Sequence, residues 1–325
     1  MPKSLSHNFV YRSSLRLTYA SQLLTGIVLT FHYVRSFDGL IIYCRDTEDG
    51  LFLRYMHANG ASLFLFFMFC HTARGFYYNS SNKSNLWASG VVILLLSMGI
   101  AFMGYVLPYG QMSYWGATVI INLLSVISFD LCILIWGRFV VSVYTLTRFY
   151  TFHFLLPLVL AVFILAHLHL LHGTRGSSLF YSFNKLSFFP YFIVKDGFIW
   201  SFFGLIFLMF VCIYPNLLGD AENFIFANPL VTPVHIKPEW YFLFAYAILR
   251  CIPNKTMGVL ALALSVAVPI VMSFGKRSYQ TGSLTLLVLV FTFLTVFGRM
   301  PIVSHYYLSS QILSLFYFLL VLLLN

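Results

Sequence analysis

Long uninterrupted apolar runs constrain the fold of this 325-residue chain more than any other feature. Hydrophobic residues make up 60% of the chain and charged residues 9%, whereas about 25% of residues in soluble domains are charged. Lipid cannot satisfy backbone polar groups, so spanning segments must be helices or a closed barrel, and runs of this length are typical of helices. We therefore expect an all-α integral membrane protein with eight transmembrane helices. The expected spans are 15–34, 56–78, 86–108, 151–172, 197–215, 256–274, 281–298 and 305–325.

An even number of spans places both termini on the same side of the membrane. The two long connections, Gly110–Thr147 and Asn216–Lys255, then lie on the opposite side. Lys and Arg divide ten to nine between the two sides, so charge alone does not orient the chain. Asp196 is the one acidic residue expected on the terminus side.

The net charge of +10 favours contact with membrane lipid and with anionic cofactor groups. Nothing in the chain resembles a nucleic-acid-binding domain. The five cysteines are scattered and form no CxxC motif, so the sequence predicts neither a disulfide framework nor a thiolate metal site.

Four histidines repeat one spacing in two of the expected spans. His57 and His71 are separated by 14 residues, and so are His153 and His167. Fourteen residues are nearly four helical turns, about 21 Å along one helix face. Two such helices would present two opposed imidazole pairs, one toward each side of the bilayer, which is the arrangement that two stacked haems require. Proton-relay histidines in a transporter are the alternative interpretation.

The surroundings of the histidines favour haem. Arg54 and Arg74 each lie three residues from a histidine of the first pair and share its helix face, where a guanidinium could pair with a haem propionate. Gly90 and Gly104 repeat the 14-residue spacing in the third span. Glycine permits close approach of a flat macrocycle to the backbone, so we expect one glycine beside each ring.

Several long strings of the sequence resemble one family, the cytochrome b of ubiquinol:cytochrome c oxidoreductase, respiratory complex III. The resemblance covers nearly the whole chain. It is carried by CRD (44–46), RYMHANGAS (54–62), GYVLPYGQMSYWGATVIINL (104–123), TLTRF (145–149) and KPEWYFLFAYAILR (237–250).

The resemblance implies two b-type haems. His57 and His153 would ligate the low-potential haem on the side of the long connections, and His71 and His167 the high-potential haem near the termini. It also implies a Q cycle, in which ubiquinol oxidation at one membrane face and ubiquinone reduction at the other are coupled to proton translocation. The expected partners are a Rieske iron–sulfur protein, cytochrome c1, other complex III subunits, a second copy of the complex and membrane lipid. The expected location is the mitochondrial inner membrane, with a bacterial plasma membrane as the alternative.

The resemblance assigns two quinone sites. Glu239 of the PEWY string would accept a proton from quinol, and apolar neighbours are expected to raise the pKa of its carboxyl group. Tyr246 and Gly137 match other residues of that pocket. The quinone-reducing site on the terminus side would include His172, Lys195 and Asp196, with Asp196 as a proton donor or hydrogen-bond partner.

The chain departs from the family pattern at two positions. Arg138 follows Gly137 where the family usually has a second glycine. In the first span Gly26 matches a glycine that contacts haem, but the position 14 residues earlier, also usually glycine, is Arg12. We expect residues 1–180 to form a haem-binding four-helix bundle and 181–325 a C-terminal four-helix region. A cytochrome b6-type subunit of a photosynthetic complex is the alternative within the same class.

Overall fold

The computed structural model describes residues 10–78, 80, 83–173, 186–271 and 281–323. Helices dominate these ranges, which contain no named β-strand. The long helices are α1 (Tyr11–Thr30), α3 (Gly50–Tyr77), α4 (Ser84–Val106), α7 (Val143–Gly173), α8 (Ile193–Cys212), α10 (Lys255–Val271), α11 (Thr281–Arg299) and α12 (Ser304–Leu323). The shorter α-helices are α2 (Phe37–Asp46), α5 (Gln111–Asn122), α6 (Phe129–Trp136) and α9 (Leu243–Arg250).

The eight long helices coincide with the eight spans expected from the sequence, with boundaries shifted by several residues. Within the described ranges, five helices are long and apolar enough to cross a membrane by length and composition: α4, α7, α8 with its preceding turn, α11 and α12. α10 is apolar but shorter, and α1 and α3 carry more polar residues. The expected all-α membrane fold is therefore confirmed.

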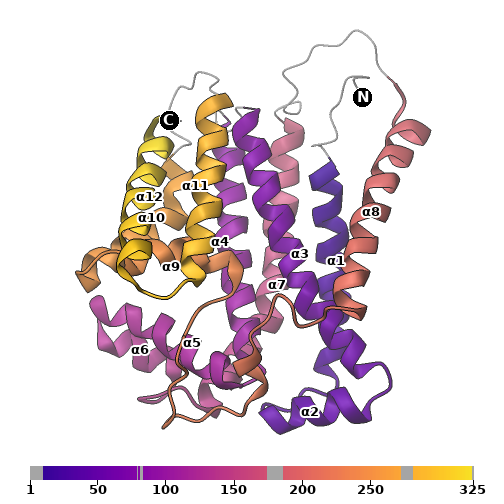
Figure 1. Cartoon of the computed structure of the whole chain (residues 1–325). Helices are drawn as coiled ribbons and strands as arrows, with labels where there is room; N and C mark the ends of the chain where they lie inside the picture. The colour runs from indigo at the N-terminus through magenta and orange to yellow at the C-terminus, as the bar shows by residue number, and fades with distance from the viewer. Residues whose placement is uncertain (1–9, 79, 81–82, 174–185, 272–280, 324–325) are drawn as a thin grey trace.

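The long helices run side by side as a bundle (Figure 1). α1 begins and α12 ends at the upper end of the view, and α2, α5 and α6 lie across the lower end. The two long connections therefore leave the bundle opposite the termini, as expected. α4 packs along α7, and α1 packs along α3. α9, α11 and α12 form the core of the C-terminal part and contact one another extensively.

Polar contacts hold the two long connections together at the lower end. Gly110 pairs with Phe226 in an isolated antiparallel bridge. The Asn223 Oδ1 atom accepts hydrogen bonds from the Ser113 backbone N–H at 2.8 Å and from the Ser113 hydroxyl at 2.9 Å. A side chain at Gly110 would overlap the Asn223 backbone, so this close crossing requires glycine.

Local sequence signals set the ends of the short helices. Ser36 caps α2 by accepting from the Gly39 N–H at 3.0 Å, and Ser128 caps α6 by accepting from the Asp130 N–H at 3.1 Å. α6 ends at Gly137, whose φ of 79° lies in the left-handed region that glycine adopts without strain.

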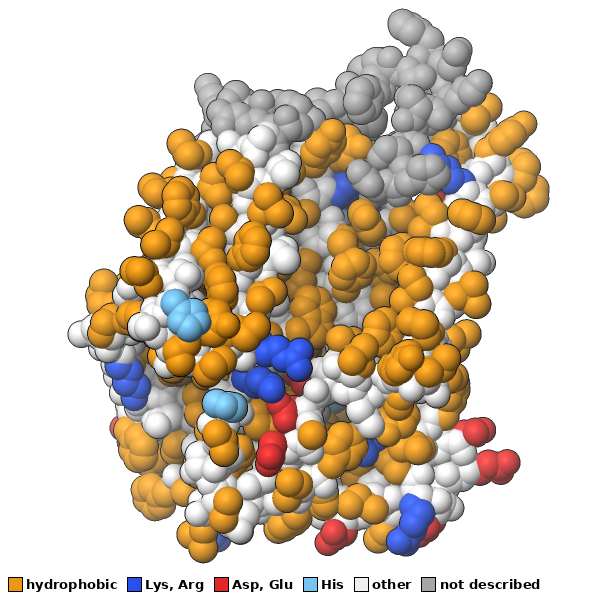
Figure 2. All heavy atoms as spheres, viewed as in Figure 1, with side chains coloured by type: hydrophobic (Ala, Val, Ile, Leu, Met, Phe, Trp, Pro, Cys, Tyr) orange, Lys and Arg blue, Asp and Glu red, His pale blue; other side chains and the backbone are white. Residues whose placement is uncertain are grey.

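Apolar side chains cover the shaft of the bundle, and the acidic side chains visible in the same view gather at its lower end (Figure 2). α8 shows this most clearly, because Phe198 is 77% exposed and Leu205 is 69% exposed. Contiguous exposed apolar surface on this scale is what a bilayer would cover.

Candidate functional site

Two helices carry the four spaced histidines and bring them into two opposed pairs. His57 and His71 project from α3, and His153 and His167 project from α7. The ring centroids of His57 and His153 lie 6.1 Å apart with an interplanar angle of 88°. An imidazole nitrogen lies about 2 Å from a bound transition metal, so two imidazoles that share one metal can have centroids about 6 Å apart. The separation of this pair therefore fits a single metal centre between the rings.

Hydrogen bonds fix the orientation of the lower pair. The His153 Nδ1–H donates to the Ile100 carbonyl oxygen at 2.8 Å. His57 Nδ1 lies 3.0 Å from the Thr25 hydroxyl oxygen, and that hydroxyl donates its only proton to the Ser21 carbonyl oxygen at 2.7 Å. With the Thr25 hydroxyl directed to Ser21, the His57 Nδ1–H is the donor toward Thr25. In both rings Nε2 keeps its lone pair, as metal ligation requires.

The same reasoning applies to His167 in the upper pair. His167 Nδ1 lies 2.8 Å from the Ser89 hydroxyl oxygen, and Ser89 donates its proton to the Leu86 carbonyl oxygen at 2.8 Å. The His167 Nδ1–H is thus the donor, and its Nε2 is available to a metal.

His71 differs from the other three histidines because its neighbour is a cation. Its Nδ1 lies 3.0 Å from Arg74 Nη2. A guanidinium has only donors, so Nδ1 accepts here and the ring proton lies on Nε2. Ligation through Nε2 therefore requires Arg74 to turn away from the ring, which a carboxylate partner for Arg74 would promote.

Glycines of neighbouring helices lie directly against three of the four rings, where a Cβ would crowd them. A Cβ on Gly26 would lie 3.0 Å from His57 Cε1, on Gly90 3.2 Å from His167 Cε1, and on Gly104 2.5 Å from His153 Cε1. Ordinary contact begins at 3.4 Å. The glycines of α1 and α4 thus leave space beside the imidazoles that any side chain would fill.

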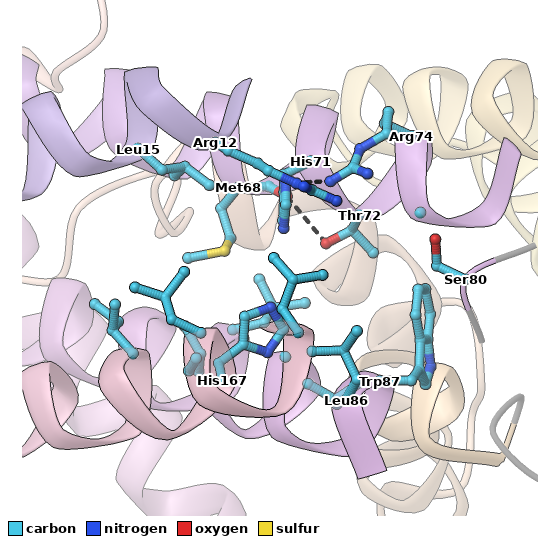
Figure 3. A pocket seen from close by; sticks show the side chains of 18 of the residues that line it. Arg12, Leu15, Met68, His71, Thr72, Arg74, Ser80, Leu86, Trp87 and His167 are labelled. Carbon is cyan, nitrogen blue, oxygen red and sulfur yellow. Dashed lines mark hydrogen bonds between the residues drawn. The ribbon is translucent and has the colours of Figure 1, made fainter. Parts of the chain in front are cut away.

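A cavity of about 210 Å³ separates the two histidines of the upper pair. In Figure 3, His71 and His167 point toward each other across this cavity, and the side chains of Arg12 and Arg74 lie on the His71 side. Arg74 is 6% exposed. An apolar chamber with opposed imidazoles and guanidinium groups at one edge matches the chemistry of a porphyrin that bears carboxylates.

Arg54 lies at the other end of α3, one turn before His57. Its guanidinium sits over the Phe224 ring at 5.6 Å, and Nη1 lies 3.8 Å from Cys44 Sγ. Arg54 therefore faces the loop end of the bundle, whereas Arg74 contacts a histidine directly.

Glu239 occupies a partly buried position at the lower end, just before the short helix Trp240–Phe242. Burial raises the pKa of the Glu239 carboxyl group to about 7. A hydrogen bond from the Tyr105 hydroxyl opposes this shift, and nearby Asp220 adds to it. A carboxyl group with a pKa near neutrality can accept and release a proton at physiological pH. The expectation of a raised pKa is therefore supported.

An ion pair lies near Glu239. Lys237 Nζ pairs with Asp220 Oδ2 at 3.1 Å. The positive charge of Lys237 also opposes the rise in the pKa of the Glu239 carboxyl group. The Tyr246 hydroxyl, expected in the same site, donates to the Ile236 carbonyl oxygen at 3.0 Å. Tyr246 thus fixes the segment that leads into the PEWY string.

Gly137 lies at the end of α6, and a Cβ there would meet the Arg148 guanidinium. The next residue, Arg138, places its guanidinium over the Tyr144 ring at 4.7 Å and donates to the Tyr144 hydroxyl at 3.3 Å. Arg138 therefore lies on the exposed surface between α6 and α7 as a side chain held by an aromatic neighbour.

The residues expected at the terminus side are partly brought together. Asp196 of α8 accepts a hydrogen bond from the Ser13 hydroxyl of α1 at 3.0 Å, next to Arg12. Lys195 is part-buried beside Asp196, and His172 is exposed in the last turn of α7. The loop that joins α7 to α8 lies outside the described residues.

Sequence reasoning missed the hydroxyl groups that orient the rings and anchor Asp196. Thr25 directly precedes Gly26, and Ser89 directly precedes Gly90. The sequence did offer a signal for these two residues, because each places a hydroxyl group immediately before a glycine that faces a histidine. Ser13 and Tyr105 had no comparable signal, because their partners lie far away in the sequence.

Comparison with known proteins accounts for both halves of the chain. Residues 1–175 match the family model described as Cytochrome b/b6/petB, and residues 226–318 match Cytochrome b(C-terminal)/b6/petD. A chain from a solved structure described as "Hyperthermophilic respiratory Complex III" is 27% identical with a TM-score of 0.92, covering 99% of this chain and 91% of that chain. These matches, together with the paired histidines inside a helical membrane bundle, show that the chain belongs to the cytochrome b family.

Proposed function

We propose that this cytochrome b is the electron-transfer subunit of a quinol:cytochrome c oxidoreductase and holds two b haems. The observation that carries the proposal is the pairing of four imidazoles, three of which have Nδ1 engaged so that Nε2 is available. His57 and His153 would ligate the low-potential haem, and His71 and His167 the high-potential haem. When bound, the two haems supply one-electron carriers stacked across the bilayer.

The residues around each pair have separate roles in this proposal. Gly26 and Gly104 leave space at the lower haem, and Gly90 leaves space at the upper one. Arg74 would pair with a propionate of the upper haem, and Arg54 with one of the lower haem. These contacts would help to hold the two haems in place.

Glu239 would take a proton from quinol at the lower end. Its burial keeps the carboxyl group close to half-ionised near neutral pH, and Tyr105 holds it in place. Of the nearby ion pair, Lys237 would favour the ionised form of Glu239 and Asp220 would favour its protonated form. Tyr246 and Gly137 would line the same pocket, with ubiquinol as substrate.

At the terminus side, Asp196 would hold or deliver a proton to bound ubiquinone, oriented by Ser13. His172 and Lys195 would contact the quinone or its surroundings. We further propose the division into a haem-binding region, 1–180, and a C-terminal region, 181–325. A Rieske protein, cytochrome c1, other subunits and a second copy of the complex are the proposed partners, in a mitochondrial inner membrane.

Two alternatives remain in competition. A cytochrome b6-type subunit is disfavoured by one continuous chain that carries both family segments and by its likeness to a complex III chain. A proton-coupled transporter would need no glycine clearance beside the histidines and would bind no haem.

Substitution of single histidines tests the proposal. In the purified, membrane-inserted complex, we expect His153→Ala to abolish one b-type absorption signal and His167→Ala to abolish the other. His169→Ala is the matched control, because His169 is an exposed residue of the same helix and should leave both signals intact. Undiminished b-type absorption in both ligand variants would overturn the proposal.

A further inference from the structure

Helix α1 breaks the pattern of glycines that face the imidazole rings, and it does so at one position. Gly26 lies against His57. Fourteen residues earlier on the same helix face is Arg12, and fourteen residues beyond His57 on the partner helix is His71. The repeat therefore aligns Arg12 with His71 in the place where a glycine would complete the set.

The structure places the Arg12 side chain in the upper cavity as this register requires. Arg12 lines the cavity with His71, Arg74 and His167, and Figure 3 shows its guanidinium beside His71 and Arg74. Arg12 also interacts electrostatically with each of these three residues. Two guanidinium groups from different helices thus converge on one edge of the chamber.

The described residues that line the chamber include more cationic than anionic side chains. Among the described residues that line it are three arginines and no Asp or Glu. The acid expected nearest to it, Asp196, accepts a hydrogen bond from Ser13 and is not a lining residue. Buried guanidinium groups favour an anion that can accept paired hydrogen bonds, and a carboxylate has the matching geometry.

We propose that Arg12 is a second carboxylate-pairing residue of the upper haem, alongside Arg74, and that its charge raises the reduction potential of that haem. This inference rests on the proposed binding of haem by His71 and His167. Reduction adds one electron to the iron and removes one unit of positive charge from the site. A fixed neighbouring cation therefore favours the reduced form, and the effect is largest in apolar surroundings.

Arg12 would position the upper haem and act on it electrostatically, and it would take no part in making or breaking bonds. Asymmetry between the two haems also follows, because α1 approaches the lower one through Gly26. The upper haem would meet a charged side chain from α1, and the lower haem would meet bare backbone.

Redox titration of the purified complex with Arg12 variants tests this inference. For Arg12→Gln we expect both haems to be retained and the one-electron reduction equilibrium of the upper haem to fall about tenfold, which corresponds to about 59 mV. Arg12→Lys keeps the charge and should recover most of the shift. The lower haem, about 21 Å away, should keep its potential in both variants.

Arg16→Gln is the comparison variant, since Arg16 also lines the cavity, one turn along α1, but is exposed whereas Arg12 is partly buried. Screening should reduce its effect to a small fraction of the Arg12 effect. An unchanged or raised potential in Arg12→Gln, or an equal shift in Arg12→Lys, would overturn the role of the Arg12 charge. If the unaltered complex contained no haem, the proposed function itself would fail, and this result is distinct from a failure of Arg12.

Discussion

Substitution of Gly104 by alanine is expected to displace one haem ligand. The added Cβ would lie 2.5 Å from His153 Cε1 and 3.1 Å from both ring nitrogens, whereas ordinary contact begins at 3.4 Å. The ring would have to move by about 1 Å, and a metal ligand tolerates deviations of only about 0.2 Å. The movement would also stretch the 2.8 Å hydrogen bond from His153 Nδ1 to the Ile100 carbonyl oxygen.

Overpacking of this kind costs about 1–3 kcal/mol, which corresponds to about a 5- to 150-fold loss of affinity for the lower haem. Haem content and redox titration of the purified complex measure this loss, and only the lower haem signal should weaken. Gly99→Ala is the matched control, because Gly99 lies on the same helix and a Cβ there has nothing within 4 Å. Full occupancy and an unchanged potential of both haems in Gly104→Ala would refute the reasoning.

Three further predictions follow from individual contacts. Burial raises the pKa of Glu239 to about 7, and a proton acceptor works in its ionised form, so the rate of quinol oxidation should rise as pH increases through about 7. Glu239→Gln should lose this pH dependence and slow turnover about 100-fold, and an unaltered pH–rate profile would contradict the role of Glu239. Ser89→Ala removes the acceptor of the His167 Nδ1–H and should weaken binding of the upper haem about 10- to 100-fold, measured by haem titration of the haem-depleted protein. Equal haem affinity in Ser89→Ala and the unaltered protein would argue against ligation by His167. Arg138→Gly should sensitise turnover about tenfold to quinol-site inhibitors that pack against a small residue, because it removes the bulk and charge that Arg138 adds next to Gly137, where the side chain contacts Tyr144. Nanomolar inhibition of the unaltered protein by such a compound would contradict this.

The helical membrane architecture could be predicted from the sequence because lipid leaves so few alternatives. Apolar runs long enough to cross a bilayer must satisfy their backbone internally, so each expected span corresponds to a long helix. The 14-residue repeat also predicted which side chains share a helix face, since helix geometry alone fixes that relation. The placement of Gly90 and Gly104 near imidazole rings followed from the same periodicity.

Contacts between distant segments could not be predicted in this way. The Tyr105 hydroxyl reaches Glu239 across more than one hundred residues, and the Ser13 hydroxyl reaches Asp196 across 183. No local pattern encodes such pairs, because they depend on how helices and loops pack. The contact of Arg74 with His71 is local, but the orientation of the Arg74 side chain depends on packing around the cavity that both residues line.

We propose that each chain holds two haems between paired imidazoles. Pyridine haemochrome analysis, calibrated against the polypeptide by quantitative amino-acid analysis, measures this stoichiometry directly in the purified complex. We expect two protohaems per chain with no covalent attachment. A value of one or none in an intact, membrane-inserted protein would contradict it.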